Sequence, residues 1–140
     1  MNPVAVRRLI YPLHEALLGR RTIPYLQMLE LTQWWTRDRL LRLQEHKLRD
    51  LLNHALARCP FYHRMIREAG VDPASASFDS LKQLPTIRKA DIRQHLDDMV
   101  DTRVRGGLHR FTTGGSTGEP LAFMMDRSRQ AADQAARARS

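Results

Sequence analysis

Apolar residues recur at helical spacing through most of the chain, and the longest run of this kind lies over residues 37–58. Its apolar positions are Leu41, Leu48, Leu52 and Ala55, separated by seven, four and three residues. Charged residues occupy the opposite face, so the pattern predicts an amphipathic helix that packs on a partner surface. Pro60 ends it, because a proline lacks a backbone N–H and excludes the preceding residue from helical geometry.

Two shorter helices are predicted before this one. The first covers residues 3–18 and ends at Gly19. Thr22 is the expected N-cap of the second, with Pro24 in its first turn. Its apolar stripe continues to Trp34-Trp35, which we expect to be packing anchors rather than membrane-interface residues.

Further short helical segments follow the long helix. The pattern predicts a helix over 61–69 that ends at Gly70, then a polar turn to Ser77. Asp79 is the expected cap of a brief helix that runs to Leu84, and another helix begins at Thr86 or Lys89 and ends near residue 96.

The hydrophobic pattern changes near residue 103. Residues 108–113 and 121–125 read as two strands, and Asp126 is the expected cap of a final helix from residue 127 onward. The fold class is therefore α+β: a mostly helical N-terminal region, a strand–loop–strand unit and a helix. Two strands alone make a marginal sheet, so we expect this to be the opening part of a larger domain.

Composition narrows the class of protein. The 140 residues are 42% hydrophobic and 27% charged, which is typical of a soluble globular chain. No segment is apolar for the roughly 20 residues that cross a bilayer, and no export signal is visible, so we expect no membrane span and a cytoplasmic location.

The net charge of +8 favours anionic partners without choosing among them. The basic residues are scattered from Arg7 to Arg139 rather than gathered beside aromatic residues, so we predict no dedicated nucleic-acid site. Cys59 is the only cysteine, and we expect it to be a small core residue rather than a nucleophile. The six histidines lack metal-ligand spacing, apart from His95 near two aspartates, which reads as a polar helix end. We therefore predict no catalytic residue and no metal ligand.

The segment FTTGGSTGEPLAF, residues 111–123, joins the two predicted strands. Its glycines let a ligand approach the main chain, and successive amides there can form an anion-binding nest. Neighbouring hydroxyls add hydrogen-bond donors, an arrangement that suits phosphate oxygens. The candidate phosphate-binding residues are Thr113, Gly114, Gly115, Ser116, Thr117 and Gly118.

Two common phosphate motifs do not fit this segment. Glu119 stands where the lysine of a P-loop would follow Gly118. The dinucleotide fingerprint fails as well, because Gly114 and Gly115 are adjacent and no helix begins directly after the loop.

The segment resembles the Ser/Thr/Gly-rich phosphate loop of adenylate-forming enzymes, [ST]-[SG]-G-[ST]-T-G-x-P. Thr113, Gly115, Ser116, Thr117, Gly118 and Pro120 match the pattern, and Gly114 stands where serine is common. Segments upstream look like the phenylacetate-CoA ligase-like branch, which includes capsular polysaccharide biosynthesis and coenzyme F390 synthetase-like proteins. These segments are LLNHA from residue 51, CPFY from 59, AGVDP from 69, the stretch 81–85 and KADIR from 89.

The resemblance implies an ATP-dependent ligase that forms an acyl-adenylate and then a thioester, with Mg²⁺ and coenzyme A. The loop would hold the β and γ phosphates of ATP. Under this interpretation residues 1–36 are a helical extension, and residues 37–140 begin the adenylating domain and stop after the loop and its following helix. We expect such a fragment to be inactive alone, since the rest of the family's active site would lie downstream. The alternative is a stand-alone basic helical adaptor that binds an acidic protein, lipid or nucleic-acid surface.

Overall fold

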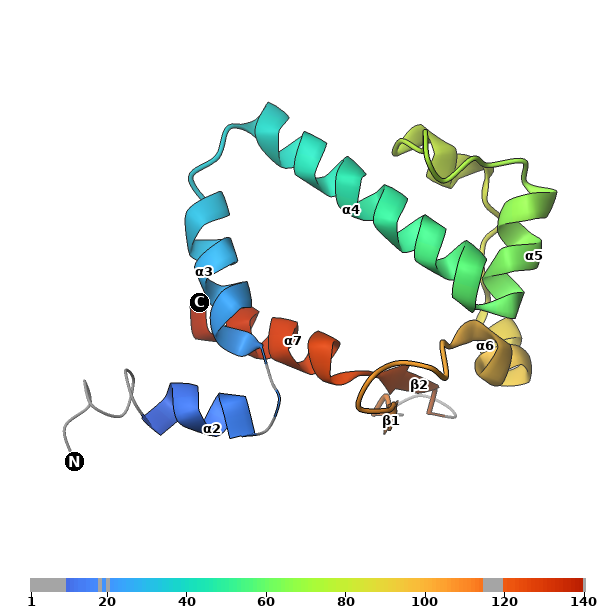
Figure 1. Ribbon diagram of the computed structural model, residues 1–140. Coiled ribbons are helices and arrows are strands. Elements are labelled where there is room, and N and C mark those ends of the chain that lie inside the picture. The colour runs from blue at the N-terminus through green and yellow to red at the C-terminus, as the bar shows by residue number, and fades with distance from the viewer. Residues whose placement is uncertain (1–9, 18, 20, 115–119, 140) are drawn as a thin grey trace. The chain divides into compact units, whose positions relative to one another are not determined.

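The computed structural model describes residues 10–17, 19, 21–114 and 120–139 (Figure 1). The chain divides into two compact units. One comprises Met1–Trp35, Arg105–His109 and Met125–Ser140, and the other comprises Thr36–Val104 and Arg110–Met124. The described secondary structure is mostly helical with one two-stranded sheet, which agrees with the predicted α+β class. The fold of an adenylate-forming domain remains a prediction.

The first unit contains α2 (Tyr11–Leu17), α3 (Thr22–Thr32) and α7 (Arg127–Arg139). Helix α7 packs on α3 through Ala131 and Ala135, both fully buried, whose small side chains allow the two backbones to approach closely. Tyr25 on α3 and Ser128 on α7 share a hydrogen bond of 2.6 Å between their hydroxyls. Asp126 caps α7 as expected, because its Oδ1 accepts the backbone N–H of Arg129 at 2.6 Å.

Thr22 differs from its predicted role as an N-cap. The cap of α3 is Arg21, and Thr22 is the first helical residue. Thr22 is 1% exposed, its backbone N–H donates to Glu15 Oε2 at 3.2 Å, and its hydroxyl donates to Gln134 Oε1 at 3.4 Å. Burial against α7 therefore engages this hydroxyl in a tertiary hydrogen bond instead of a cap.

The predicted end of this helix was also wrong. Helix α3 stops at Thr32, and Trp34 beyond it is 83% exposed, so Trp34 is not a packing anchor. Gly19, which follows α2, has a φ of +62°, the left-handed conformation expected of a residue that stops a helix. The first seven residues of the helix predicted over 3–18 lie outside the described part, and Tyr11–Leu17 is helical.

The second unit is built around α4 (Arg37–Arg58), which begins and ends where the apolar pattern predicts. Pro60 starts α5 (Pro60–Glu68), and Gly70 ends it with a φ of +67°. Helices α4 and α5 pack against each other and enclose the core of this unit (Figure 1). The core residues are Leu48, Leu52, Ile66, Val71 and Ala76.

The remaining elements of this unit are short. They are the 3₁₀ helices η2 (Asp79–Gln83) and η3 (Leu96–Met99) and the helix α6 (Lys89–His95). Asp79 is not the cap expected of it, since Phe78 holds that position and Asp79 Oδ1 pairs with Lys82 Nζ at 2.6 Å. Helix α6 starts at Lys89, the second of the two predicted starts, and Asp91 Oδ2 accepts the backbone N–H of Arg88 at 2.7 Å.

Strands β1 (His109–Thr112) and β2 (Ala122–Met125) form the two-stranded sheet. Both were predicted, each with one or two more residues at its ends. Phe111 and Phe123 stack across the two strands with ring centroids 6.0 Å apart. Residues 113–121, the Gly-Ser-Thr segment, join the two strands, so this segment begins and ends at neighbouring positions of the sheet.

Candidate functional site

The Gly-Ser-Thr segment begins and ends beside the sheet at a pair of hydrogen bonds between Thr113 and Leu121, which we call the neck. Thr113 directly follows β1, and its backbone N–H donates to the carbonyl oxygen of Leu121 at 3.0 Å. Leu121 returns a bond, since its N–H donates to Thr113 Oγ1 at 3.0 Å. As an acceptor in this bond, the Thr113 hydroxyl keeps its own proton for donation to another group.

Two of the six candidate phosphate residues, Thr113 and Gly114, fall in the described part of the chain. Among the described residues, no atom outside Gly114 and its chain neighbours lies within 4 Å of where a Cβ on Gly114 would stand. Gly115, Ser116, Thr117 and Gly118 lie outside the described residues. The phosphate role of the six residues therefore remains a prediction.

A hollow of about 370 Å³ adjoins the end of this segment. Helix α6 and the start of η3 form one wall, with Ile92, Arg93 and Leu96. The strands and the residue just after the undescribed loop form the other, with Arg110, Pro120 and Ala122. All six residues belong to one compact unit.

The alternation of side chains along the strands decides which residues reach the hollow. Successive strand residues point to opposite faces of a sheet. Arg110 and Ala122 line the hollow, whereas their neighbours Phe111 and Phe123 form the stacked aromatic pair. The sequence pattern gives neither Arg93 nor Arg110 a place in this hollow, because local spacing does not bring residues 17 positions apart together.

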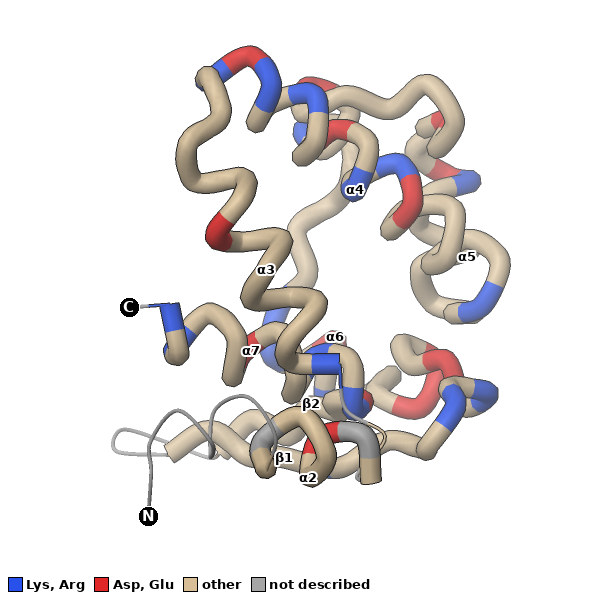
Figure 2. The backbone as a smooth tube through the Cα atoms, turned by 60° about the vertical axis from the view of Figure 1, so that its left-hand side comes forward, with Lys and Arg blue, Asp and Glu red and all other residues tan. Residues whose placement is uncertain are grey.

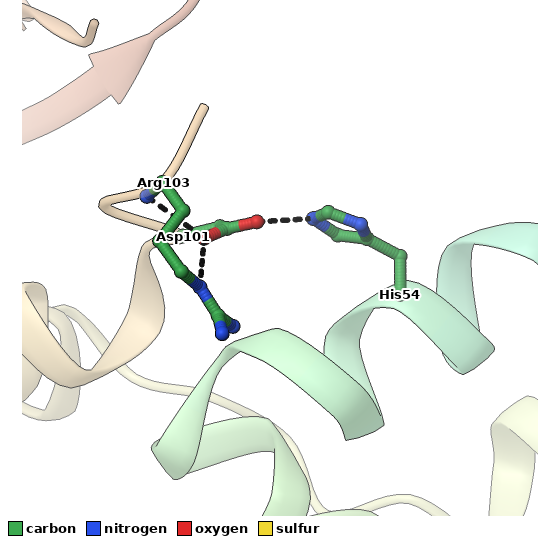
Figure 3. A network of polar contacts seen from close by, with 3 residues as sticks. All are labelled: His54, Asp101 and Arg103. Carbon is green, nitrogen blue, oxygen red and sulfur yellow. Dashed lines mark hydrogen bonds and ion pairs between the residues drawn. The ribbon is translucent and has the colours of Figure 1, made fainter. Parts of the chain in front are cut away.

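A second polar group joins α4 to the segment that follows η3 (Figure 3). The carboxylate of Asp101 accepts the backbone N–H of Arg103 at 2.9 Å, and its Oδ1 lies 3.3 Å from Arg103 Nε. His54 Nε2 is 3.6 Å from Asp101 Oδ2. The hydrogen bond from the Arg103 backbone is the main reason that the pKa of Asp101 lies below its usual value.

This group stabilises structure rather than resembling a catalytic pair. No sequence signal linked His54 and Asp101, which are 47 positions apart.

Cys59 is buried, as predicted, with 7% of its surface exposed. Burial raises the pKa of its thiol, and the nearby charge of Asp101 raises it further. A thiol that resists deprotonation is a poor nucleophile, so the core role is supported.

His95 and its neighbour Asp98 each contact another side chain of the described part of the chain. The His95 ring lies 5.5 Å from the ring of Phe61, and Asp98 Oδ2 pairs with Arg64 Nη2 at 3.3 Å. Within the described residues, no three histidine, cysteine or acidic side chains come together in a way that could hold a metal ion. The polar helix end predicted at this position is what the structure contains.

Across residues 10–17, 19, 21–114 and 120–139, no helix has the length and apolar character needed to cross a bilayer.

Comparison with known proteins identifies two curated relatives. A phenylacetate-coenzyme A ligase of Thermus thermophilus is 35% identical over 86 residues, which is 60% of this chain and 19% of the ligase. Protein CapK of Staphylococcus aureus is 30% identical over 84 residues, 60% of this chain and 18% of that protein. The chain thus spans about a fifth of the length of the curated relatives that it matches. No protein-family model and no solved structure matches the chain significantly.

Two relatives agree with the resemblance read from the loop and the upstream segments. They match part of the chain at modest identity, and the segment with which they align is a small part of each. Over about three-fifths of its length, this chain is homologous to proteins of the phenylacetate-CoA ligase-like branch.

Proposed function

We propose that the chain supplies the phosphate-binding part of an ATP-dependent, adenylate-forming carboxylate–CoA ligase-like enzyme. Support comes from the match of residues 113–120 to the loop motif of that superfamily and from the two curated relatives. The observation that carries the proposal is the neck at Thr113 and Leu121, which holds the two ends of the motif together on a sheet.

The neck matters because phosphate recognition by main-chain amides depends on geometry. Each amide contributes a partial charge, and several must converge on one anion to bind it well. A segment with both ends fixed loses less freedom when a ligand orders it. Paired ends therefore favour a phosphate-binding role over a simple flexible linker.

The proposed reaction has two steps. A substrate carboxylate oxygen attacks the α-phosphorus of ATP, the bond from that phosphorus to the bridging oxygen breaks, and pyrophosphate leaves. The thiolate of coenzyme A then attacks the acyl carbon and displaces AMP. The loop residues would position the β and γ phosphates and stabilise the charge of the departing pyrophosphate.

The described side chains near the neck suit a polyphosphate. The Thr113 hydroxyl retains a proton to donate, and Arg110 lines the adjoining hollow. Bound Mg²⁺ would neutralise phosphate charge and polarise phosphoryl oxygens. We propose no protein ligand for it, because Mg²⁺ is commonly carried by substrate phosphates.

We expect no thioester synthesis by these 140 residues alone. The aligned segment is under a fifth of the Thermus ligase. The acid, the acceptor thiol and any role in capsule synthesis are properties of a longer polypeptide under this proposal.

Thermal unfolding with and without Mg-ATP, at fixed ionic strength, tests the proposal. We expect Mg-ATP to raise the unfolding temperature of the full chain, because a ligand that binds only the folded state stabilises it. Gly118→Asp should abolish that rise by placing a negative charge among the phosphates. Gln44→Glu adds the same charge to an exposed position of α4 and should leave the rise intact.

Two outcomes would contradict the proposal. A cooperative transition that does not respond to Mg-ATP would favour the basic adaptor. An equal response in Gly118→Asp would place the nucleotide elsewhere. The adaptor predicts a localised basic face, whereas Lys and Arg are interspersed with Asp and Glu along α4 (Figure 2).

A further inference from the structure

We propose that Arg58, Arg64 and Arg103 form a binding site for a small phosphate monoester that carries an apolar organic group. The site is a hollow at the junction of α4 and α5, which we call the α4–α5 hollow. It goes beyond the proposed function and does not depend on it, since no residue of the phosphate-loop motif lines it.

Three arginines from three segments line this hollow, which has a volume of about 400 Å³. Arg58 is the last residue of α4, Arg64 lies on α5, and Arg103 lies in the segment after η3. All three belong to one compact unit, and every residue that lines the hollow falls in the described part of the chain. None of these lining residues is an aspartate or a glutamate, so the hollow gathers positive charge.

The ion pairs around the hollow leave one positive charge without a counter-ion. Arg64 Nη2 pairs with Asp98, and Arg103 Nε pairs with Asp101. The side chain of Arg58 makes no ion pair or hydrogen bond with any described residue. The pair of Arg64 and Asp98 has two half-exposed side chains. Such pairs contribute little stability, so a ligand can compete for the Arg64 guanidinium.

Asp101 orients the guanidinium of Arg103. Its Oδ1 contacts Arg103 Nε, and the two terminal nitrogens of the guanidinium point away from the carboxylate (Figure 3). The carboxylate is itself held by the backbone N–H of Arg103 and by His54 Nε2. An arginine that is already oriented loses less side-chain freedom when it binds a ligand, and its terminal N–H groups remain as donors.

The chemistry of these groups favours a phosphate over a carboxylate. A guanidinium is planar, remains charged at physiological pH, and binds phosphate oxygens through two parallel hydrogen bonds. A phosphate monoester offers three terminal oxygens as acceptors. Guanidinium donors that come from three directions can each contact a different oxygen of one such group.

The other walls of the hollow suit an organic group. Leu56 and Pro60 contribute aliphatic surface beside the arginines. His63 is held at the wall, since its Nδ1 lies 2.8 Å from the carbonyl oxygen of Leu56. Sites for small organic molecules begin at roughly 300 Å³, so the hollow has room for more than a phosphate ion. A phosphate monoester with a small apolar group therefore matches both the charge and the walls.

NMR titration of the ¹⁵N-labelled full chain with phenyl phosphate, at fixed pH and ionic strength, tests the site. Inorganic phosphate lacks the organic group, and phenol lacks the anion, so these two compounds separate the contributions of charge and apolar surface. We expect phenyl phosphate to bind more tightly than inorganic phosphate and phenol to show no measurable binding. The largest shifts should fall on backbone amides of residues 58–64 and 103.

Arg58→Gln should weaken the binding of phenyl phosphate by about tenfold, because it removes the charge that has no counter-ion and a charge-assisted hydrogen bond. Arg42→Gln is the matched control, since it removes one positive charge from an exposed position of α4 outside the hollow and should change the affinity little. Arg103→Lys keeps the charge but loses the paired hydrogen bonds, so an intermediate affinity is expected.

Four results would overturn the proposal. These are no binding of phenyl phosphate, equal weakening in Arg42→Gln and Arg58→Gln, binding of phenol as tight as that of phenyl phosphate, and binding of inorganic phosphate as tight as that of phenyl phosphate. The last result would mean a simple anion site without a place for the organic group. Circular dichroism shows whether each variant is folded, and Arg103→Lys keeps the test decisive if Arg58→Gln unfolds.

Discussion

At the scale of single residues, chemistry that looks catalytic in the sequence is mostly structural. Cys59 is buried with a raised pKa, and His54 contacts a carboxylate that also binds Arg103. Asp101 makes both of these contacts, with His54 and with Arg103. Its side chain is 10% exposed and joins α4, through His54, to the segment after η3. Its role is to connect elements, and the lowering of its pKa comes mainly from the backbone hydrogen bond of Arg103.

Asp101 gives the protein an acid-dependent contribution to stability. Its pKa in the folded chain is lower than the unfolded value of about 3.9. The carboxylate therefore stabilises the folded state above that unfolded value, and the contribution is lost as the pH falls below about 4 toward the folded pKa. Urea unfolding of wild type and Asp101→Asn between about pH 3 and pH 7 measures it.

We expect the free energy of unfolding of Asp101→Asn to depend less on pH than that of the wild type below about pH 4. Asp79→Asn is the control, because Asp79 is an exposed carboxylate paired only with Lys82 three residues away. An unchanged acid dependence in Asp101→Asn would show that the contacts of Figure 3 do not form in solution.

At the scale of elements, a helix begins or ends at the predicted residue where residues close to it in the sequence supply the cap or the stop signal. Helix α4 matches its prediction, Pro60 starts α5, and Asp126 caps α7. The predicted caps at Thr22 and Asp79 were wrong, because each side chain contacts another side chain instead of a backbone N–H of its helix. Thr22 bonds Gln134, 112 residues away, and this competition could not be read from neighbouring residues.

Gly70 ends α5 in a conformation that disfavours replacement. Its φ of +67° is disfavoured for residues with a Cβ, and no neighbouring atom lies within 4 Å of where a Cβ would stand. Gly70→Ala should therefore destabilise the chain by about 1–2 kcal/mol through backbone strain alone. Chemical denaturation measures this loss.

Gly114→Ala is a matched control for the effect on stability. It also has open space around the added Cβ, but its φ is not positive. Its free energy of unfolding should stay within about 0.5 kcal/mol of wild type. Equal losses in the two variants would rule out backbone strain as the cause at Gly70.

At the scale of the whole molecule, the chain consists of two compact units, each with its own packing. Ala131 and Ala135 lie at the contact of α7 with α3, and a leucine-rich core lies between α4 and α5. The core of the second unit also receives Val71 and Ala76 from the turn after Gly70. Arg49 secures that turn, since its Nε donates to the carbonyl oxygen of Ala76 at 2.9 Å.

Two adjacent leucines of α4 test this arrangement. Leu52 is 6% exposed in the core, whereas Leu51 is 61% exposed. Leu52→Ala should lower the free energy of unfolding by about 2–5 kcal/mol, because it leaves a cavity. Leu51→Ala should change it by about 0.5 kcal/mol or less. Similar losses in both variants would mean that α4 does not present this face to the core.

The sequence by itself determined the order of the helices and strands, the extent of α4, the turn at Gly70 and the resemblance of the loop to a phosphate motif. Each depends on residues close together in the chain, whose spacing, φ preferences and hydrogen-bonding groups act locally. Tertiary structure decided the partners of Thr22, the contact of His54 with Asp101, and the hollow that Arg93 shares with Arg110. These depend on which distant surfaces bury one another, and packing rather than local spacing determines that.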